Sequence, residues 1–491
     1  MITRHPVPAL PPWALLGLGG VVTVPVGLRW NVAALAWVAP VPFLLFLRRS
    51  HGWKARFTLL AVLMVVTHLQ VLKIVTNPIP FGMVPMFALP IALVAWFVYV
   101  GWDILRARSS EAWAIYGFPA LTALAEIAGY RLTEGGTWGT TATTQLENLP
   151  LIQLLSLTGS SGLAFLLGWV ASLLAAFLAA SDRRWLKVHA AILGVTLLGV
   201  FTYGSIRVFA SQDRTVRVGG VVSNLGLDAG GLPSREALGK NLDDLFERSA
   251  AAADEGARLV VWNEGASAIH KDDEPAALAR GQSLARERGI DLVLAYIIPL
   301  SEKPFTFENK YVWISENGVV LETYLKHHPV PGEGSVRGTE PLRVHPRPYG
   351  TTAGAICYDY DFPAMGLAHA ALGAGLVVVP SSDWKGIDPY HSQMARLRAI
   401  ESGVSVVRPV RWATSMAFDA YGRTRGVLPY FESNDRILLV RVPTEPVKTL
   451  YAHIGDSVGA FYALLLSGAV ASALINRRKR ASSAVDPLAP A

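Results

Sequence analysis

Three side chains stand at the ends of predicted β-strands, and together they could carry out acyl transfer. Glu264, Lys326 and Cys357 each close a run of residues that predicts a strand. Ligands of α/β sheets usually bind at strand ends. A carboxylate can take the proton of a thiol, which then attacks a carbonyl carbon. An ammonium group can stabilise the oxyanion that forms.

Each of these residues also has a commoner structural role. Glu264 and Lys326, taken singly, are typical of surface groups or salt bridges. Cys357 is the only cysteine among 491 residues, so it cannot form an internal disulfide, and no zinc-binding cysteine spacing exists. A lone cysteine is most often a small buried hydrophobic residue. Only the three residues together, with their surroundings, can therefore indicate a function.

The elements that position this set alternate between strand and helix. Helices are predicted at 235–256, 274–288, 363–372 and 391–402. Strands are predicted at 216–222, 258–262, 291–297, 310–315, 319–325, 351–356, 375–380, 404–410 and 414–419. Such alternation is typical of a layered α/β domain.

The chain before this domain is typical of a multi-pass membrane protein. Residues 1–208 contain 14 basic and only 6 acidic residues. A bilayer requires about 20 apolar residues per helix. Spans are predicted near 12–29, 31–47, 57–75, 85–105, 112–130, 161–181, 187–208 and 455–475. A signal peptide at 1–29 is the alternative, but further spans follow immediately, which favours an uncleaved helix.

Five groups of basic residues beside these spans predict the orientation, and they begin with Arg4, Arg48, Arg106, Arg183 and Arg477. They precede the first span and follow the second, fourth, sixth and last spans, where Arg477–Arg480 forms a basic run. All of them fall on one side, which the positive-inside rule makes cytoplasmic. The α/β domain is then extracytoplasmic. The net charge of +7 reflects this topology, so no nucleic-acid partner is predicted.

The resulting domain organisation has four parts. We predict a seven-helix transmembrane domain at 1–211 and an extracytoplasmic catalytic domain at 212–450. A closing transmembrane helix with a basic cytoplasmic end follows at 451–480. The Ala-, Ser- and Pro-rich residues 481–491 predict a disordered tail.

Four ordered sequence blocks resemble the carbon–nitrogen hydrolase (nitrilase) superfamily. They are 262–265, 324–333, 354–359 and 380–399. The resemblance implies an αββα sandwich with a Glu–Lys–Cys triad. Two membrane segments, 36–44 and 149–166, are similar to the apolipoprotein N-acyltransferase family within that superfamily.

This resemblance implies a reaction and its partners. A fatty acyl chain would pass from a phospholipid to the α-amino group of a diacylglyceryl-cysteine on an apolipoprotein, in the cytoplasmic (inner) membrane of the cell. Neither a cofactor nor a metal is implied, and a monomer is expected. Two alternatives stay open. One is a membrane-tethered amidase of a small amide, and the other is a non-catalytic lipoprotein-binding homologue.

The same resemblance assigns roles to individual residues. Cys357 would be the nucleophile that carries the thioester, Glu264 the general base and Lys326 the group that stabilises the oxyanion. Glu333 matches a second family glutamate that would orient Lys326 or shuttle a proton. Its alternative is a solvated loop carboxylate. Tyr358 would shape the site, and its backbone N–H could donate to the oxyanion.

The chain departs from the family pattern at several positions. Asp359 replaces a glutamate two residues after the nucleophile, and Arg411-Trp412 replaces a Thr-Asn pair. The segment between Lys326 and Glu333 is one residue shorter, and the loop 224–232 lacks a family tryptophan. These changes surround expected substrate contacts rather than the triad. Outside the triad, His391 at a predicted helix start is expected to be a cap or a surface group.

Overall fold

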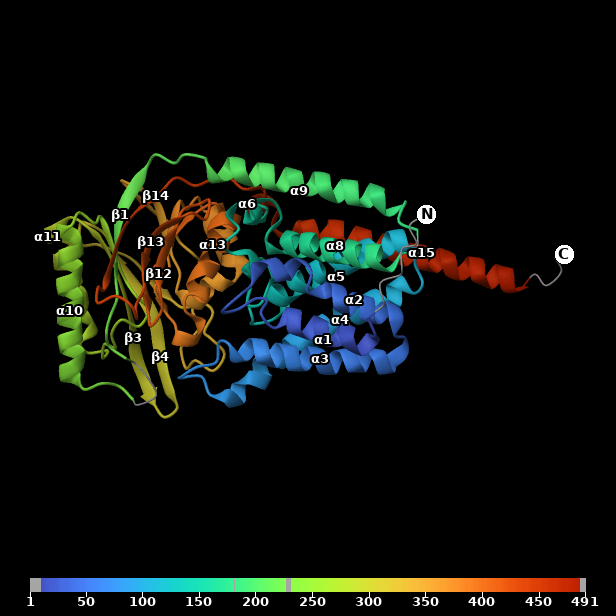
Figure 1. Cartoon of the computed structure of the whole chain (residues 1–491). Coiled ribbons are helices and arrows are strands. Elements are labelled where there is room, and N and C mark those ends of the chain that lie inside the picture. Colours follow the sequence, from blue (N-terminus) through green and yellow to red (C-terminus); the bar gives the residue numbers. More distant parts are fainter. Residues whose placement is uncertain (1–9, 181, 227–230, 486–491) are drawn as a thin grey trace.

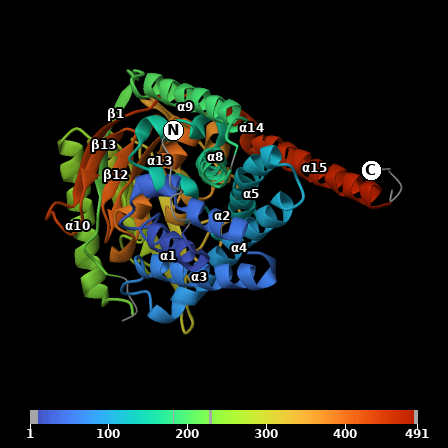
Figure 2. The ribbon, with the colours of Figure 1, turned by 45° about the vertical axis from the view of Figure 1, so that its right-hand side comes forward.

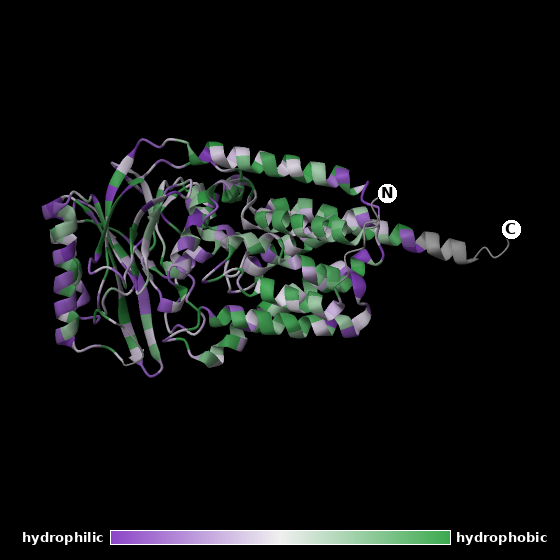
Figure 3. Cartoon of the chain, in the orientation of Figure 1, coloured by the Kyte–Doolittle hydropathy of each residue, from purple (hydrophilic) through white to green (hydrophobic). Residues whose placement is uncertain are grey.

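The computed structural model describes residues 10–180, 182–226 and 231–485. A bundle of helices forms one end of the molecule and an α/β domain the other (Figure 1). Apolar residues dominate the bundle, whereas helices on the outer face of the α/β domain carry many polar residues (Figure 3). The last helix extends past the rest of the bundle (Figure 2).

The bundle is built from eight main helices. These are α1 (Pro12–Thr23), α2 (Pro40–Arg49), α3 (Gly52–Leu72), α4 (Val84–Arg106), α5 (Glu111–Leu132), α8 (Ser160–Ala179), α9 (Leu186–Val208) and α15 (Gly459–Val485). Within the described ranges, five segments are long and apolar enough to cross a membrane. They are Gly52–Leu72, Phe81–Arg106, Ser160–Ala179, Leu186–Val208 and Leu450–Arg477. The chain is therefore a multi-pass membrane protein.

The first two predicted spans are shorter than expected. In place of 12–29 the structure has α1, which has 12 residues, and in place of 31–47 it has α2, which has 10. At about 1.5 Å per residue these helices are about 18 and 15 Å long, against about 30 Å of bilayer core. Pro40 begins α2, and the preceding residues form only a short 3₁₀ turn, Ala33–Trp37. The count of eight spans stays a prediction.

Short elements connect the bundle to the α/β domain. Between α5 and α8 lie η3 (Thr141–Gln145), α6 (Leu149–Ile152) and α7 (Leu155–Thr158). The Gln153 side chain, just after α6, donates to the main-chain oxygen of Tyr421 at 2.8 Å. This region therefore holds the two parts of the chain against each other.

The α/β domain contains two six-stranded sheets. The first has the order β14-β1-β2-β3-β4-β5 and the second β13-β12-β10-β8-β7-β6. The first consists of β1 (Thr215–Val221), β2 (Leu259–Trp262), β3 (Asp291–Glu302), β4 (Phe305–Ile314), β5 (Val320–Leu325) and β14 (Ile437–Pro443). The second consists of β6 (His345–Arg347), β7 (Gly350–Gly354), β8 (Leu376–Val378), β10 (Ser405–Arg408), β12 (Ser415–Phe418) and β13 (Thr424–Leu428).

Helices cover the two sheets on their outer faces. The first sheet is covered by α10 (Arg235–Asp254) and α11 (Glu274–Arg288). On the other side, α12 (Pro363–Ala371) and α13 (Tyr390–Ser402) lie between the second sheet and the bundle (Figure 1). Central strands such as β2 are buried on both faces, which explains their continuous apolar runs. The predicted αββα sandwich beside a helical membrane domain is confirmed.

One predicted strand, 404–410, is divided in the structure. Pro409 separates β10 from β11 (Val410–Arg411), and β11 pairs with β9 (Ser381–Ser382) rather than with β8. Proline has no N–H for the ladder, so the pairing changes there. At the other end of the chain, α15 continues to Val485, past the predicted boundary at 480. Residues 486–491 of the predicted tail lie outside the described residues.

The end of α13 yields a test of packing. Gly403 has a φ of +68°, and a Cβ there would lie 1.7 Å from the main-chain oxygen of Val447. Gly289, at the end of α11, has a φ of +61° but open space around it. Gly289→Ala should cost about 1–2 kcal/mol from backbone conformation alone. Gly403→Ala should lower the thermal unfolding midpoint in detergent clearly further. Equal losses would contradict the packing described for α13.

Candidate active site

A buried ammonium group lies between two carboxylates at the edge of the first sheet. Lys326, directly after β5, places Nζ 2.8 Å from Glu264 Oε1 and 2.8 Å from Glu333 Oε2. Its side chain is only 2% exposed. Burial would lower the pKa of Lys326, but attraction to Glu264 and Glu333 raises it well above the usual value. Lys326 is therefore charged throughout the physiological range.

Glu333 belongs to this group and is not a solvated loop carboxylate. Besides Lys326 it accepts a hydrogen bond from the main-chain N–H of Val330 at 2.8 Å. Burial would raise the pKa of Glu333, yet Lys326 and these hydrogen bonds lower it. Asn309 in β4 completes the group, since its side-chain amide donates to Glu264 at 2.7 Å and to Glu333 at 3.0 Å.

Cys357 stands where β7 gives way to the 3₁₀ turn η4 (Cys357–Asp361). Its φ of +47° is unusual for a residue with a side chain. The main-chain N–H of Cys357 donates to the oxygen of Pro380 at 2.9 Å. This turn holds the thiol between the two sheets, where the residue is 4% exposed.

The surroundings of the thiol oppose its ionisation. Burial, together with the charges of Glu264 and Asp383, raises the pKa of Cys357 well above the usual value, while Arg408 and Lys326 act in the opposite direction. Glu264 Oε2 accepts the main-chain N–H of Ser382 at 3.0 Å. Among the described residues, the hydrogen-bond contacts of Sγ are with Ser382, Asp383 and Arg408.

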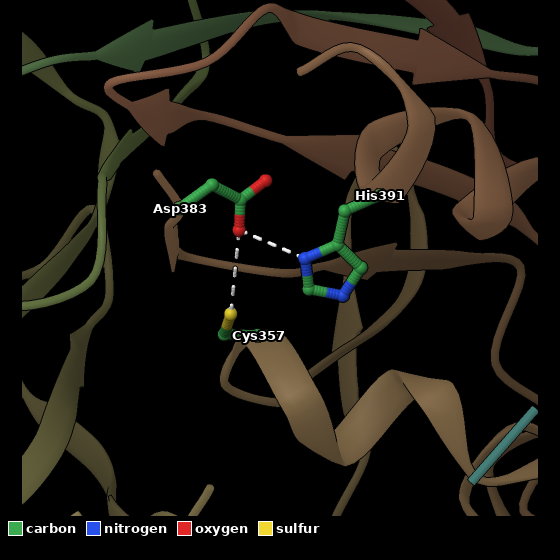
Figure 4. Close-up of side chains that lie close together, drawn as sticks. All are labelled: Cys357, Asp383 and His391. Carbon is green, nitrogen blue, oxygen red and sulfur yellow. Dashed lines mark hydrogen bonds and ion pairs between the residues drawn. The ribbon is translucent and has the colours of Figure 1, made fainter. Parts of the chain in front are cut away.

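A second charged cluster, which includes Asp383 and Arg408, also contacts Sγ, and the sequence did not predict it. His391, the second residue of α13, places Nδ1 2.8 Å from Asp383 Oδ1 (Figure 4). Its Nε2 lies 2.9 Å from Asp361 Oδ2. The prediction of a cap or surface histidine is wrong, because α13 is buried between the second sheet and the bundle. Burial would lower the pKa of His391, but the two carboxylates raise it to about 9.

The atoms of this cluster also have the spacing of metal ligands. Cys357, Asp383 and His391 each offer one ligand atom, all within 4.8 Å of one another. The guanidinium of Arg408, however, lies between them. Its Nη2 is 3.7 Å from Sγ, 2.9 Å from Asp383 Oδ1 and 2.9 Å from His391 Nδ1. An arginine cation thus occupies the position that a metal ion would take, and the set does not fit a metal in this arrangement.

Asp359 is fully buried two residues after Cys357. Its Oδ2 accepts from the Tyr324 hydroxyl at 2.8 Å and the Ile356 N–H at 3.0 Å, and its Oδ1 accepts from the His328 N–H at 2.6 Å. The short side chain therefore satisfies its hydrogen bonds within its own turn and the neighbouring loop. Burial would raise the pKa of Asp359, but a hydrogen bond with the His328 side chain, the Ile356 N–H and the charge of Lys326 lower it.

Tyr358 connects the site to the membrane part. Its hydroxyl donates to the main-chain oxygen of Glu134 at 2.5 Å, just beyond α5.

At another departure from the family pattern, Arg411 donates to Ser382 Oγ at 2.9 Å and stacks on Trp412. Arg411 therefore contacts Ser382, whose main-chain oxygen lies 3.9 Å from Cys357 Sγ.

A cavity of about 740 Å³ lies at the junction of the two parts. Its wall includes His328 and Phe362 from the catalytic domain, next to Asp359, and residues from the end of α5. Arg131 and Arg337 add positive charge to this wall, each paired with a carboxylate. The cavity therefore offers both apolar and charged surface near the site.

The two-sheet sandwich with helices on its outer faces is the fold of a carbon–nitrogen hydrolase domain. A family model described as carbon-nitrogen hydrolase matches residues 229–452, and one described as apolipoprotein N-acyltransferase N-terminal domain matches residues 17–173. Both lie in one chain, which therefore belongs to the apolipoprotein N-acyltransferase family, and it is an enzyme of that family.

Individual relatives extend along most of the chain. An apolipoprotein N-acyltransferase of Geobacter metallireducens is 26% identical, covering 91% of this chain and 92% of its own length. One from Gloeobacter violaceus is 27% identical, covering 92% of this chain and 91% of its own. Among solved structures, an amidase from Nesterenkonia sp. is 22% identical with a TM-score of 0.41, covering 52% of this chain and 98% of that one.

Asp359 provides a pH-dependent test of the site. Because its pKa is lower in the folded chain, its ionised form stabilises the fold above about pH 4, the ordinary aspartate value, and this stability is lost as pH falls through the lowered pKa. Asp359→Asn should therefore lower the thermal midpoint at pH 7 and differ less from the wild type below about pH 4. The exposed Asp272→Asn serves as control. A constant difference across this range would contradict the assignment.

Proposed function

We propose that this chain transfers a fatty acyl group from a phospholipid, through a thioester on Cys357, to the α-amino group of diacylglyceryl-cysteine on an apolipoprotein. The acyltransferase class follows from family membership. The proposal rests above all on one observation, the buried Glu264–Lys326–Glu333 group beside the only cysteine of the chain.

The first half-reaction loads the enzyme. Glu264 takes the proton of the Cys357 thiol, and Sγ attacks the ester carbonyl carbon of the phospholipid. A C–S bond forms, and the carbonyl oxygen becomes an oxyanion that the Lys326 ammonium stabilises. When the intermediate collapses, the C–O bond to glycerol breaks. The departing alkoxide takes the proton back from Glu264 and leaves as a lysophospholipid.

The second half-reaction delivers the acyl group. The α-amino group of the lipoprotein attacks the thioester carbonyl, and Glu264 accepts one of its protons. The C–N bond forms, the C–S bond breaks, and the Cys357 thiolate regains the proton from Glu264. Glu333 and Asn309 orient Lys326 and Glu264 in both steps, and the Tyr358 N–H is the second candidate donor to the oxyanion.

Lipid substrates agree with the position of the site. The cavity beside His328 and Phe362 lies where the catalytic domain meets the bundle, which suits a lipid that enters from the bilayer. The helices α2 and α4 end away from the catalytic domain (Figure 1), and their last turns carry basic residues such as Arg49 and Arg106. This arrangement supports a catalytic domain on the extracytoplasmic side of the cytoplasmic membrane.

The thioester gives a direct test of the proposal. The detergent-purified chain is incubated with phospholipid vesicles, and its intact mass is measured. We expect an acyl adduct that hydroxylamine removes. Cys357→Ala should give none, and Glu264→Gln should form it about a hundredfold more slowly or worse, since general base catalysis contributes about 10²–10⁴-fold.

A second stage separates this activity from its alternatives. Addition of a synthetic peptide bearing an N-terminal diacylglyceryl-cysteine should discharge the adduct and increase the peptide mass by one acyl chain. An adduct from a small soluble amide but not from vesicles would instead indicate a membrane-tethered amidase. Absence of any adduct, with Cys357 still reactive toward a thiol reagent, would refute the proposed reaction.

A further inference from the structure

Arg408 is the cation that contacts the nucleophile. It ends β10, and its side chain is 2% exposed. Its Nη2 lies 3.7 Å from Cys357 Sγ, closer than the Asp383 carboxylate at 3.9 Å. Figure 4 shows Cys357, Asp383 and His391 pointing toward one another, and Nη2 is in contact with all three.

The position of the Arg408 guanidinium is fixed by several hydrogen bonds. Both of its terminal nitrogens bind Asp383, at 2.9 and 3.0 Å, which is the two-pronged geometry that arginine forms with carboxylates. Nη1 also donates to Ser392 Oγ at 2.7 Å. The guanidinium therefore keeps Nη2 directed at Sγ.

The charges around Sγ create a need for such a cation. A thiolate here adds negative charge to a buried site that already contains Glu264 and Asp383. Lys326 is already held by two carboxylates at 2.8 Å each, and none of its hydrogen bonds within the described ranges leads to Sγ. Buried anions are stable only when paired.

We propose that Arg408 stabilises the Cys357 thiolate, both before attack on the acyl donor and when the thioester is broken. The inference rests on the proposed function only in taking Cys357 as the nucleophile. Asp383 and Ser392 are the positioning residues that hold Arg408.

A chain of contacts continues from this cluster to the membrane part. Asp383 binds His391, and His391 binds Asp361. Asp361 in turn accepts the indole N–H of Trp138 at 2.7 Å, and its main-chain oxygen accepts the N–H of Thr137 at 3.0 Å. Trp138 also packs on the His391 ring at 5.0 Å. The segment after α5 therefore supports the residues that hold Arg408.

The single cysteine makes the inference measurable. In the full-length, detergent-purified chain, Cys357 is the single thiol, so alkylation by iodoacetamide is followed on the Cys357 peptide by mass spectrometry, and the pH dependence of its rate reports the thiolate fraction. Five charged or titratable groups face Sγ in this profile: Glu264, Lys326, Asp383, Arg408 and His391, whose own pKa is raised to about 9. Arg408→Gln should move the midpoint upward by about one to three pH units, the effect of losing an opposite charge at this distance. Arg408→Lys should restore part of the shift.

Two further variants keep the test decisive. Arg398→Gln also removes a buried guanidinium, one that pairs with Glu401 in α13, and should leave the midpoint unchanged. If Arg408→Gln does not fold, Ser392→Ala loosens Arg408 by a single hydrogen bond and should move the midpoint upward by a smaller amount.

A wild-type midpoint in both folded Arg408→Gln and Ser392→Ala, or an equal shift in Arg398→Gln, would overturn the inference. Thioester formation is measured separately on the same samples. A missing adduct with the expected alkylation shifts would refute the proposed function but not the role of Arg408. A normal adduct in the wild type, without the expected shifts of the alkylation midpoint in the variants, would refute the role of Arg408 but not the proposed function.

Discussion

The Lys326 ammonium, buried between two carboxylates, is the interaction on which the architecture of the site depends. Removing one partner of a buried ion pair costs about 3–5 kcal/mol, because an uncompensated charge is left behind. Glu264, Glu333 and Asn309 must therefore all remain in place around it. They come from a loop after β2, a loop after β5 and the strand β4, so this one charge fixes the relative positions of three segments.

The second sheet holds its own buried cation in a similar way. Arg408 is paired with Asp383, just as Lys326 is paired with Glu264 and Glu333. Cys357 lies between the two groups, on a turn with positive φ that follows a strand of the second sheet. The nucleophile thus sits where two separately balanced ion networks meet. The charge around the sulfur depends on ionised groups from both sheets, so it is established only when the two sheets pack together.

Sequence patterns revealed the residues whose role follows from local position. Glu264, Lys326 and Cys357 each follow a strand within three residues, and a strand is visible in a short apolar run. Asn309, Asp383 and Arg408 were not predicted, because only tertiary pairing of distant segments turns them toward the site. His391 was misjudged for the same reason. The helix that carries it is covered by the second sheet on one side and by the bundle on the other. The local sequence pattern does not predict where the bundle packs.

The contacts of Trp138 and Glu134 give the membrane part a role beyond anchoring. Both residues precede the catalytic domain by more than seventy positions, yet they complete hydrogen bonds of Asp361 and Tyr358, close to the nucleophile. A chain truncated to the sandwich alone would lack the residues that form hydrogen bonds with Asp361 and Tyr358. The two halves therefore constrain each other in evolution, and a catalytic domain exchanged between family members would require a matching segment after α5.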